Sequence, residues 1–207
     1  FALHGLGRFR EAQAAFEDAL LYMEEGMERM WRVPGWAVDS DTRDLLRAVE
    51  GSPEDEARLL RELWQMADPL YVVAGNDRLT AHYARWTVAT IRDDARNPFH
   101  VRWGRDLDQL TVRHGWELGW ERSPSKDFST PDHVIGHKHP EGRDFMPPGV
   151  AIADPASASV EALTADRRSP GSLYAPGYAP VLLPMDGQLA VFPRGSRMVI
   201  VTTHFLP

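Results

Sequence analysis

The chain has 207 residues, of which 43% are hydrophobic, and this size suits one large domain or two small ones with a packed core. The formal net charge of −7 argues against a nucleic-acid-binding surface, which normally carries a basic stripe, so we expect no nucleic acid among the partners. Cysteine is absent, which excludes disulfides and thiolate chemistry, and the chain has no run of 18 or more apolar residues to form a transmembrane helix.

The residue types change near residue 122. All seven tryptophans lie between Trp31 and Trp120, whereas 12 of the 16 prolines come after Arg122. Proline cannot continue a helix or a central strand. We therefore expect an aromatic, helical first part, followed by a second part of loops, turns and short strands.

The first predicted element is a helical hairpin at the start of the chain. Apolar residues recur at helical spacing from Leu3 to Met23, and Gly5-Leu6-Gly7 marks a break between two helices. The order of small and large residues resembles a tetratricopeptide repeat, although an ordinary amphipathic hairpin explains the pattern equally well. Because repeat arrays need about three units and one is visible, we expect further repeats before Phe1 in a longer protein.

Two more helices are predicted from their start and stop residues. The first covers Ser40 to Val49, with Ser40 or Asp41 as its N-cap and Gly51 as its stop. The second begins at Ser52-Pro53, a capping residue followed by a proline in the first helical position, and it ends at Asp68-Pro69.

Apolar spacing predicts two further helices before residue 115. One runs from Asp77 to Ala95, with these residues facing inward: Leu79, Tyr83, Trp86, Val88 and Ile91. The other is short, from Gly104 to His114, with these residues inward: Leu107, Leu110 and Val112. Gly115 is expected to end it in the left-handed conformation.

The block that follows is predicted to form a rigid aromatic corner between the two parts of the chain. Its five structural residues are Trp103, Gly115, Trp116, Gly119 and Trp120. Each glycine precedes a tryptophan, so the backbone can pass close to a neighbour while the indole rings cover it. We expect the corner to seal the junction between helices and strands. A platform on which a sugar or peptide stacks is the alternative.

The middle of the chain resembles the GWxTD-domain proteins of bacteria over about residues 58–150. The motifs are RELWQMADPLYVVAGNDRLTAHYARW, NPF and WGRDLDQLTVRHGWELGWERS, and the matching positions are Trp64, Asp68, Pro69, Asn76, the helix of residues 78–85 and Gly115-Trp116. The chain departs from the family where Glu117-Leu118-Gly119-Trp120 replaces the Thr-Asp of the signature. Members of this family have no established chemistry, look extracytoplasmic and are often joined to repeat modules. The resemblance thus implies location and architecture.

The second part begins with a proline-rich irregular segment up to residue 170, in which one short helix is predicted at Ser157–Asp166. Two runs of apolar or β-branched residues follow, Gly187–Phe192 and Ser196–Phe205, and Pro193-Arg194-Gly195 joins them. They predict a β-hairpin that opens an incomplete β-sandwich, with its other strands past residue 207.

These elements together predict the α+β fold class, with four segments along the chain. They are a tetratricopeptide-repeat-like helical segment (residues 1–51), a helical core that resembles the GWxTD domain (52–122), a proline-rich loop segment (123–171) and the start of a β-sandwich (172–207).

Three histidines in the sequence HVIGHKHPEG are the sharpest candidates for chemistry: His133, His137 and His139. The His-x-His spacing places two rings on the same side of an extended strand, and imidazole is a good ligand for zinc or copper. A polar surface loop, whose histidines hydrogen-bond to the backbone, is the alternative interpretation.

The sequence predicts a non-enzymatic scaffold or protein-interaction module. The serines lie in no Gly-x-Ser-x-Gly turn, and the glycines form no phosphate-binding loop, so no catalytic residue and no cofactor is expected. The partners would be other proteins, and a periplasmic or otherwise extracytoplasmic accessory subunit of a membrane protein complex fits best. The alternative is a metal-binding protein or metal-dependent hydrolase centred on the three histidines.

Overall fold

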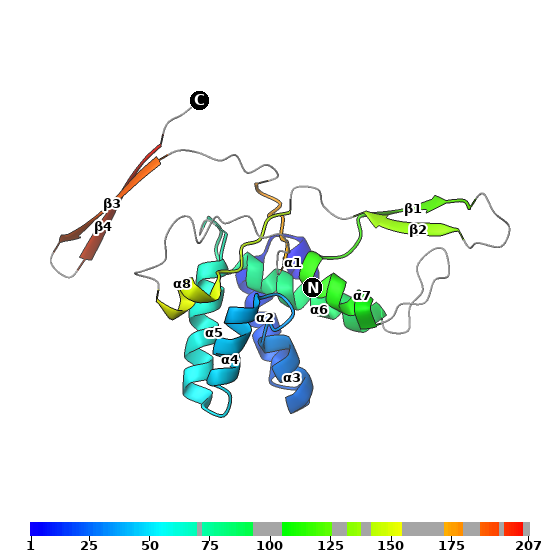
Figure 1. Ribbon diagram of the computed structural model, residues 1–207, viewed down its shortest axis with the longest axis horizontal. Helices are drawn as coiled ribbons and strands as arrows, with labels where there is room; N and C mark the ends of the chain where they lie inside the picture. The colour runs from blue at the N-terminus through cyan, green and yellow to red at the C-terminus, as the bar shows by residue number, and fades with distance from the viewer. Residues whose placement is uncertain are drawn as a thin grey trace. The chain divides into compact units, whose positions relative to one another are not determined.

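The structure is a computed structural model, and it describes residues 1–69, 72–92, 105–125, 132–137, 142–154, 172–179, 187–194 and 197–204 (Figure 1). Within these ranges the chain forms eight helices and two antiparallel sheets of two strands each, which confirms the α+β class. No helix in the described ranges is long and apolar enough to cross a membrane. The chain divides into two compact units, residues 1–176 and 177–207.

All eight helices belong to the first unit. They are α1 (Ala2–Gly5), α2 (Phe9–Leu20), α3 (Glu25–Arg32), α4 (Ser40–Ala48), α5 (Pro53–Ala67), α6 (Asp77–Arg92), α7 (Arg105–His114) and α8 (Gly149–Ala153). The predicted break between α1 and α2 is confirmed, since the chain turns at Leu6 and Gly7. Figure 1 shows α4, α5 and α8 beside one another, and α8 is in contact with both α4 and α5.

Helix α6 is the centre of the first unit. Every residue from Asp77 to Trp86 is buried, and α6 packs against α1, α2, α5 and α7. Trp86 is stacked between two other indoles, with its ring centroid 4.9 Å from that of Trp36 and 6.3 Å from that of Trp31. Burial of such large apolar surfaces supplies most of the driving force for folding.

The same core draws on helices from both sides of the predicted boundary at residue 51. Phe16 of α2 and Trp64 of α5 belong to one continuous cluster of buried side chains with Tyr83 of α6. Residues 172–176, which the prediction assigned to its last segment, also lie in the first compact unit.

Two residues that were predicted to face inward are exposed. Ile91 follows the buried Trp86 by five residues, which is about 140° around a helix, so it points away from the core and Ala89 faces inward instead. Leu110 precedes the fully buried Val112 by two residues, about 200° around α7, so the two cannot share a face.

The start of α4 has a capping residue, with one correction to the prediction. The N-cap of α4 is Asp39, and neither Ser40 nor Asp41 takes that role, because Asp39 has extended backbone angles and its carboxylate accepts a hydrogen bond from the backbone N–H of Thr42 at 2.8 Å. Gly51 has a φ of +94°, as its predicted role as a stop requires.

Three short elements lie where the sequence predicted continuous loop or corner. Strand β1 (Gly119–Ser123) pairs with β2 (His133–His137), with Gly119 opposite His137. Helix α8 packs against α4, and Gly149 allows this contact because an added Cβ would lie 2.7 Å from the Cβ of Asp41. Elements of five residues are too short for a visible hydrophobic period, so the sequence did not indicate them. The short helix predicted at residues 157–166 lies outside the described residues.

The second unit contains the predicted C-terminal hairpin. Strand β3 (Gly187–Arg194) pairs antiparallel with β4 (Arg197–His204), with Gly187 opposite His204. Three consecutive residues of β4, Val199, Ile200 and Val201, are exposed, and consecutive strand residues point to opposite faces. The β-sandwich to which this hairpin was assigned stays a prediction.

Candidate functional site

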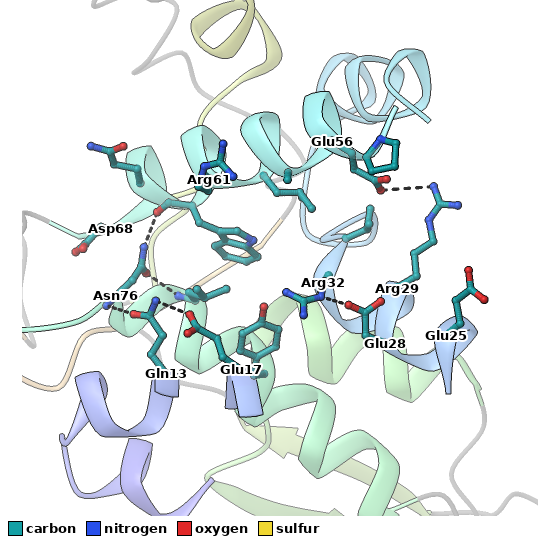
Figure 2. A pocket seen from close by; sticks show the side chains of 18 residues that line it. Gln13, Glu17, Glu25, Glu28, Arg29, Arg32, Glu56, Arg61, Asp68 and Asn76 are labelled. Atoms are coloured by element: carbon teal, nitrogen blue, oxygen red, sulfur yellow. Dashed lines mark hydrogen bonds and ion pairs between the residues drawn. The ribbon is translucent and has the colours of Figure 1, made fainter. Parts of the chain in front are cut away.

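Helices α2, α3, α5 and α6 surround a hollow of about 950 Å³, which we call the interhelical groove (Figure 2). Its apolar lining consists chiefly of Val33, Leu60, Trp64, Leu79 and Tyr83. Its charged lining consists of the carboxylates of Glu17, Glu25, Glu28, Glu56 and Asp68 and the guanidinium groups of Arg29, Arg32 and Arg61.

Gly75 brings the connection between α5 and α6 against the start of α2. Its φ is +90°, a conformation that L side chains rarely adopt, and an added Cβ would lie 2.5 Å from the backbone nitrogen of Arg10. Only glycine fits both conditions. The close approach places the next residue, Asn76, at one end of the groove.

Asn76 joins three of the four helices that form the groove. Its Oδ1 accepts a hydrogen bond from the backbone N–H of Leu79 at 2.8 Å and so caps α6. Its Nδ2 donates to the carbonyl of Trp64 in α5 at 2.6 Å, and its backbone N–H donates to Oε1 of Gln13 in α2 at 3.3 Å. Asn76 therefore holds the walls at this end in a fixed spacing.

Asp68 lies beside Asn76 in the wall of the groove, directly after the end of α5. Its Oδ1 is buried and has no hydrogen-bond partner. Burial, and next the negative charge of Asp77, raise the pKa of the Asp68 carboxyl to about 6. The end of a helix also disfavours a negative charge. The surroundings thus destabilise the ionised form of the Asp68 carboxyl, and such destabilised groups are more typical of functional than of structural sites.

The apolar wall of the groove is continuous with the core. Trp64 is 6% exposed, and its ring centroid lies 5.0 Å from that of His82. Tyr83 packs against Phe16 at 5.4 Å, and burial raises the pKa of its hydroxyl to about 12, so it stays protonated. This wall offers aromatic surface that is already held in place.

The two ends of the groove differ in how their charges are satisfied (Figure 2). At the α3 end Arg29 forms ion pairs with Glu50 at 2.9 Å and Glu56 at 3.6 Å, and Arg32 pairs with Glu28. Figure 2 shows Asp68, Asn76, Gln13 and Glu17 together at the other end.

At the Asp68 end no ion pair forms among the described residues. Glu17 accepts a hydrogen bond from Gln13 at 2.9 Å. The Gln13 side chain is neutral and the Glu17 side chain is negative, so this contact is no ion pair. Arg61 lines the groove but is exposed, and within the described part of the chain it forms neither an ion pair nor a hydrogen bond to Asp68. This end of the groove therefore holds carboxylates without a basic partner.

Three of the positions that carried the family resemblance come together here. Trp64, Asp68 and Asn76 all line the groove, and Pro69 is fully buried next to Asp68. Sequence reasoning missed Gly75 and Gln13. The Gly-Asn-Asp sequence before α6, which is typical of a turn followed by a helix cap, was a usable indication of Gly75.

The described residues of the predicted corner lie directly after α7 and in β1. Gly115 ends α7 with a φ of +82°, and an added Cβ would lie 3.4 Å from the Arg85 guanidinium, so the backbone does pass close to a neighbour there. Trp116 packs at the edge of the core and meets Phe1 edge to face, with the ring centroids 5.7 Å apart.

Trp120 belongs to β1, whereas Trp116 precedes that strand, so the two indoles do not share a strand face. Trp120 covers Gly136 of β2, where an added Cβ would lie 3.1 Å from the indole ring. An added Cβ at Gly119 would meet nothing within 4 Å, so no close backbone approach requires glycine there. Trp103 lies outside the described residues.

A second group of charged side chains lies on another side of α6. We call Asp77, Arg78, Arg85, Ser172 and Tyr174 the arginine cluster. Arg85 donates to the carbonyl of Arg113 at 2.9 Å and also to those of Val112 and Leu173, while Ser172 accepts from both arginines. The Tyr174 hydroxyl donates to Asp77 at 2.9 Å.

Both guanidinium groups of the arginine cluster are buried. Burial lowers the pKa of Arg78 to about 10 and that of Arg85 well below its ordinary value. Their donors hold residues 172–174 against α6 and α7, and a buried charge with partners fixed by the backbone acts as a structural tie. The sequence did not indicate this group, because Ser172 and Tyr174 lie far from α6 along the chain.

The histidines proposed as metal ligands are only partly described. His133 and His137 stand at the two ends of β2, and the exposed His137 ring lies 3.1 Å from a carboxylate oxygen of Glu121. The side chain of His133 and the whole of His139 are outside the described residues. Among the residues that are described, no three His, Asp or Glu side chains are arranged to hold a metal ion. The metal site stays a prediction.

Comparisons with protein-family models, with curated proteins and with solved structures found no match to this chain. The resemblance to GWxTD-domain proteins and to a tetratricopeptide repeat rests on the sequence motifs.

Proposed function

We propose that the chain is a non-enzymatic protein-interaction module, and that the interhelical groove binds a basic segment of a partner protein. The observation that carries the proposal is a hollow of about 950 Å³ with an aromatic wall and a charged rim. Ligand-binding hollows in proteins have volumes of about 300–1,000 Å³. Interfaces combine aromatic residues at the centre with polar residues at the edge.

The charge of the groove supports a basic partner. Five carboxylates and three guanidinium groups line it, and two of the three arginines, Arg29 and Arg32, already pair with glutamates of this chain. Opposite charge across an interface favours the correct partner and speeds its association. A segment with lysine or arginine next to a large apolar residue would satisfy both the free carboxylates and the aromatic wall.

The wider role proposed is that of an extracytoplasmic accessory subunit in a larger, membrane-associated bacterial complex. The absence of cysteine and the resemblance to GWxTD-domain proteins support it. The groove adds a place at which such a subunit could hold a neighbouring chain. The metal-binding alternative, centred on His133, His137 and His139, has no described geometry in its favour.

The groove proposal is tested by selecting binders from a random peptide display library on the 207-residue chain. We expect selected peptides to be rich in lysine, arginine and aromatic residues. Their binding should fall at least about tenfold when Ala57→Trp fills the groove, since tenfold equals about 1.4 kcal/mol and losing one buried side chain exceeds that. Ala57 lies on the α5 wall and is exposed, so the larger side chain extends into the hollow.

The matched control is Ala15→Trp. Ala15 is also exposed in mid-helix, on α2, and it does not line the groove. It should leave peptide affinity unchanged. Equal affinity of the selected peptides for both tryptophan variants would show that they bind elsewhere, and a library that yields no binder would also contradict the proposal.

A further inference from the structure

Within the groove one position is built to recognise a single positive charge. We infer that Asp68 receives the ammonium or guanidinium group of a lysine or arginine in the partner segment, an inference that rests on the proposed function of the groove. The side chain of Asp68 lines the groove beside Asn76, and its Oδ1 is buried without a hydrogen-bond partner. A buried carboxylate oxygen that lacks a donor is energetically unfavourable, and a cationic donor would remove that cost.

Among the described residues, no cation or hydrogen-bond donor is bonded to Oδ1 of Asp68. The amide of Asn76, its neighbour, is already occupied by the carbonyl of Trp64 and the backbone N–H of Leu79. Arg32 pairs with Glu28, and among the described residues Arg61 forms no bond to Asp68. A basic side chain of the partner segment can therefore supply the donor.

The surroundings of Asp68 suit a long basic side chain better than a metal ion. Trp64, Leu79 and Tyr83 line the same groove, and lysine and arginine bury their aliphatic stems along apolar surface while the charged head reaches a polar group. A divalent cation such as calcium needs about six to eight oxygen ligands. One carboxylate beside an amide that is already bonded does not provide them.

The charges around Asp68 strengthen its preference for a cation. Asp77 at the start of α6 and Glu17 on α2 are negative, and among the described residues that line this end Arg61 on α5 is the one basic group. The pKa of Asp68 is raised to about 6 in the unbound chain, and a bound cation stabilises the ionised carboxylate. Binding should therefore release a proton near pH 6 and weaken as the pH falls below that value.

The test is a double-mutant cycle on one peptide from the display selection described above. Its four members are the chain and its Asp68→Asn variant, each with the peptide and with the peptide whose lysine or arginine is replaced by glutamine. Calorimetry at pH 7.5 should show a loss of about tenfold for either single change, as expected for one charge-assisted hydrogen bond. The double change should add little to either single loss.

Glu25→Gln is the matched control. Glu25 is an exposed carboxylate at the opposite end of the groove, so its loss should change affinity less than about twofold, as expected for an exposed charge. Between pH 7.5 and 5 the affinity of the parent chain should fall, and that of Asp68→Asn should stay level.

Two results would overturn the inference while leaving the groove proposal intact. One is a cycle in which the two losses simply add, with binding still sensitive to Ala57→Trp. The other is a set of selected peptides without a preferred basic position. Insensitivity to Ala57→Trp would instead remove the groove as the binding site, and the Asp68 inference with it.

Discussion

The two sides of α6 handle charge in opposite ways. In the arginine cluster, Arg85 is 5% exposed, and its hydrogen bonds are accepted by the carbonyls of Val112, Arg113 and Leu173 and by Ser172. Arg78 bonds Ser172, while its Nε and Nη1 are buried without a hydrogen-bond partner. On the groove side, among the residues that the structure describes, Asp68 has a buried oxygen without a donor, and Glu17 is bonded by the amide of Gln13 alone. Both environments include residues of α6: Arg78 and Arg85 belong to the arginine cluster, whereas Leu79 and Tyr83 line the groove.

This contrast separates a structural polar group from a candidate binding group. The Arg85 donors are matched to fixed carbonyls, so they tie segments of the chain together and leave nothing for a partner. A carboxylate that lies in an open hollow without a donor is destabilising by itself, so its stabilisation has to come from outside the chain. Stability measurements on each side of α6 should show opposite signs.

The largest effect is expected from Arg85→Ala. It leaves the carbonyls of Val112, Arg113 and Leu173 without their donor, and a buried unsatisfied group costs about 1–3 kcal/mol, so the loss in unfolding free energy should be on the order of 3–5 kcal/mol. Urea denaturation measures it. Arg43→Ala is the control, because Arg43 is exposed, and it should change stability by less than about 0.5 kcal/mol. Similar losses in unfolding free energy for Arg85→Ala and Arg43→Ala would show that the arginine cluster does not stabilise the fold.

An intermediate effect is expected from Gly75→Ala, compared with Gly51→Ala. Both glycines have positive φ, +90° and +94°, so both substitutions carry the backbone cost of about 1–2 kcal/mol. At Gly75 the new methyl group would also meet the backbone of Arg10, whereas at Gly51 it meets nothing within 4 Å.

The Gly75→Ala variant should therefore lose about 1–3 kcal/mol more than Gly51→Ala in thermal or urea unfolding, which is typical of overpacking. The difference between the two losses measures the close packing of Gly75 against the backbone of Arg10, which places Asn76 at the end of the groove. Equal losses would mean that the α5–α6 connection can move away from α2 without cost.

The smallest effect, with the opposite sign, is expected from Asp68→Asn. The folded-state pKa of about 6 lies above the ordinary value of 3.8, so the folded chain binds the proton more tightly than the unfolded chain. The ionised group is therefore destabilising above about pH 6, and this penalty disappears as the pH falls to about 4.

At pH 7.5 Asp68→Asn should raise the unfolding free energy by less than about 1 kcal/mol, since the side chain is partly solvated, and at pH 4 it should have no effect. Differential scanning calorimetry at the two pH values measures this. A variant that is destabilised at pH 7.5 would show that Asp68 has a stabilising partner, and the contrast between the two sides of α6 would no longer hold.

Helices and their ends were predictable because their causes are local. The Ser52-Pro53 start of α5, the stop at Gly51 and the C-terminal hairpin follow from capping, φ preferences and β-branched runs, each of which acts over a few residues. The errors were local as well: Asp39 caps α4 one residue earlier than expected, and the strand β2 is too short to show a period.

The candidate site was predictable only in part. Trp64, Asp68 and Asn76 were singled out through motif resemblance, yet nothing in the sequence places them on one hollow with Gln13 and Tyr83. The predicted corner drew attention to Gly115 and Trp116, and its close packing turns out to involve Arg85, a residue 30 positions earlier in the chain.

The sequence by itself determined the α+β class, the helices α1, α2 and α4 to α7, and the hairpin of β3 and β4, because hydrophobic period, capping and turn residues act along the chain. Only the tertiary structure decided which charges have partners. That depends on distances between residues far apart in sequence, such as Arg85 and Leu173, or Asp68 and Glu17. The free energy of a buried charge depends on those neighbours, so the groove and the arginine cluster became distinguishable only in three dimensions.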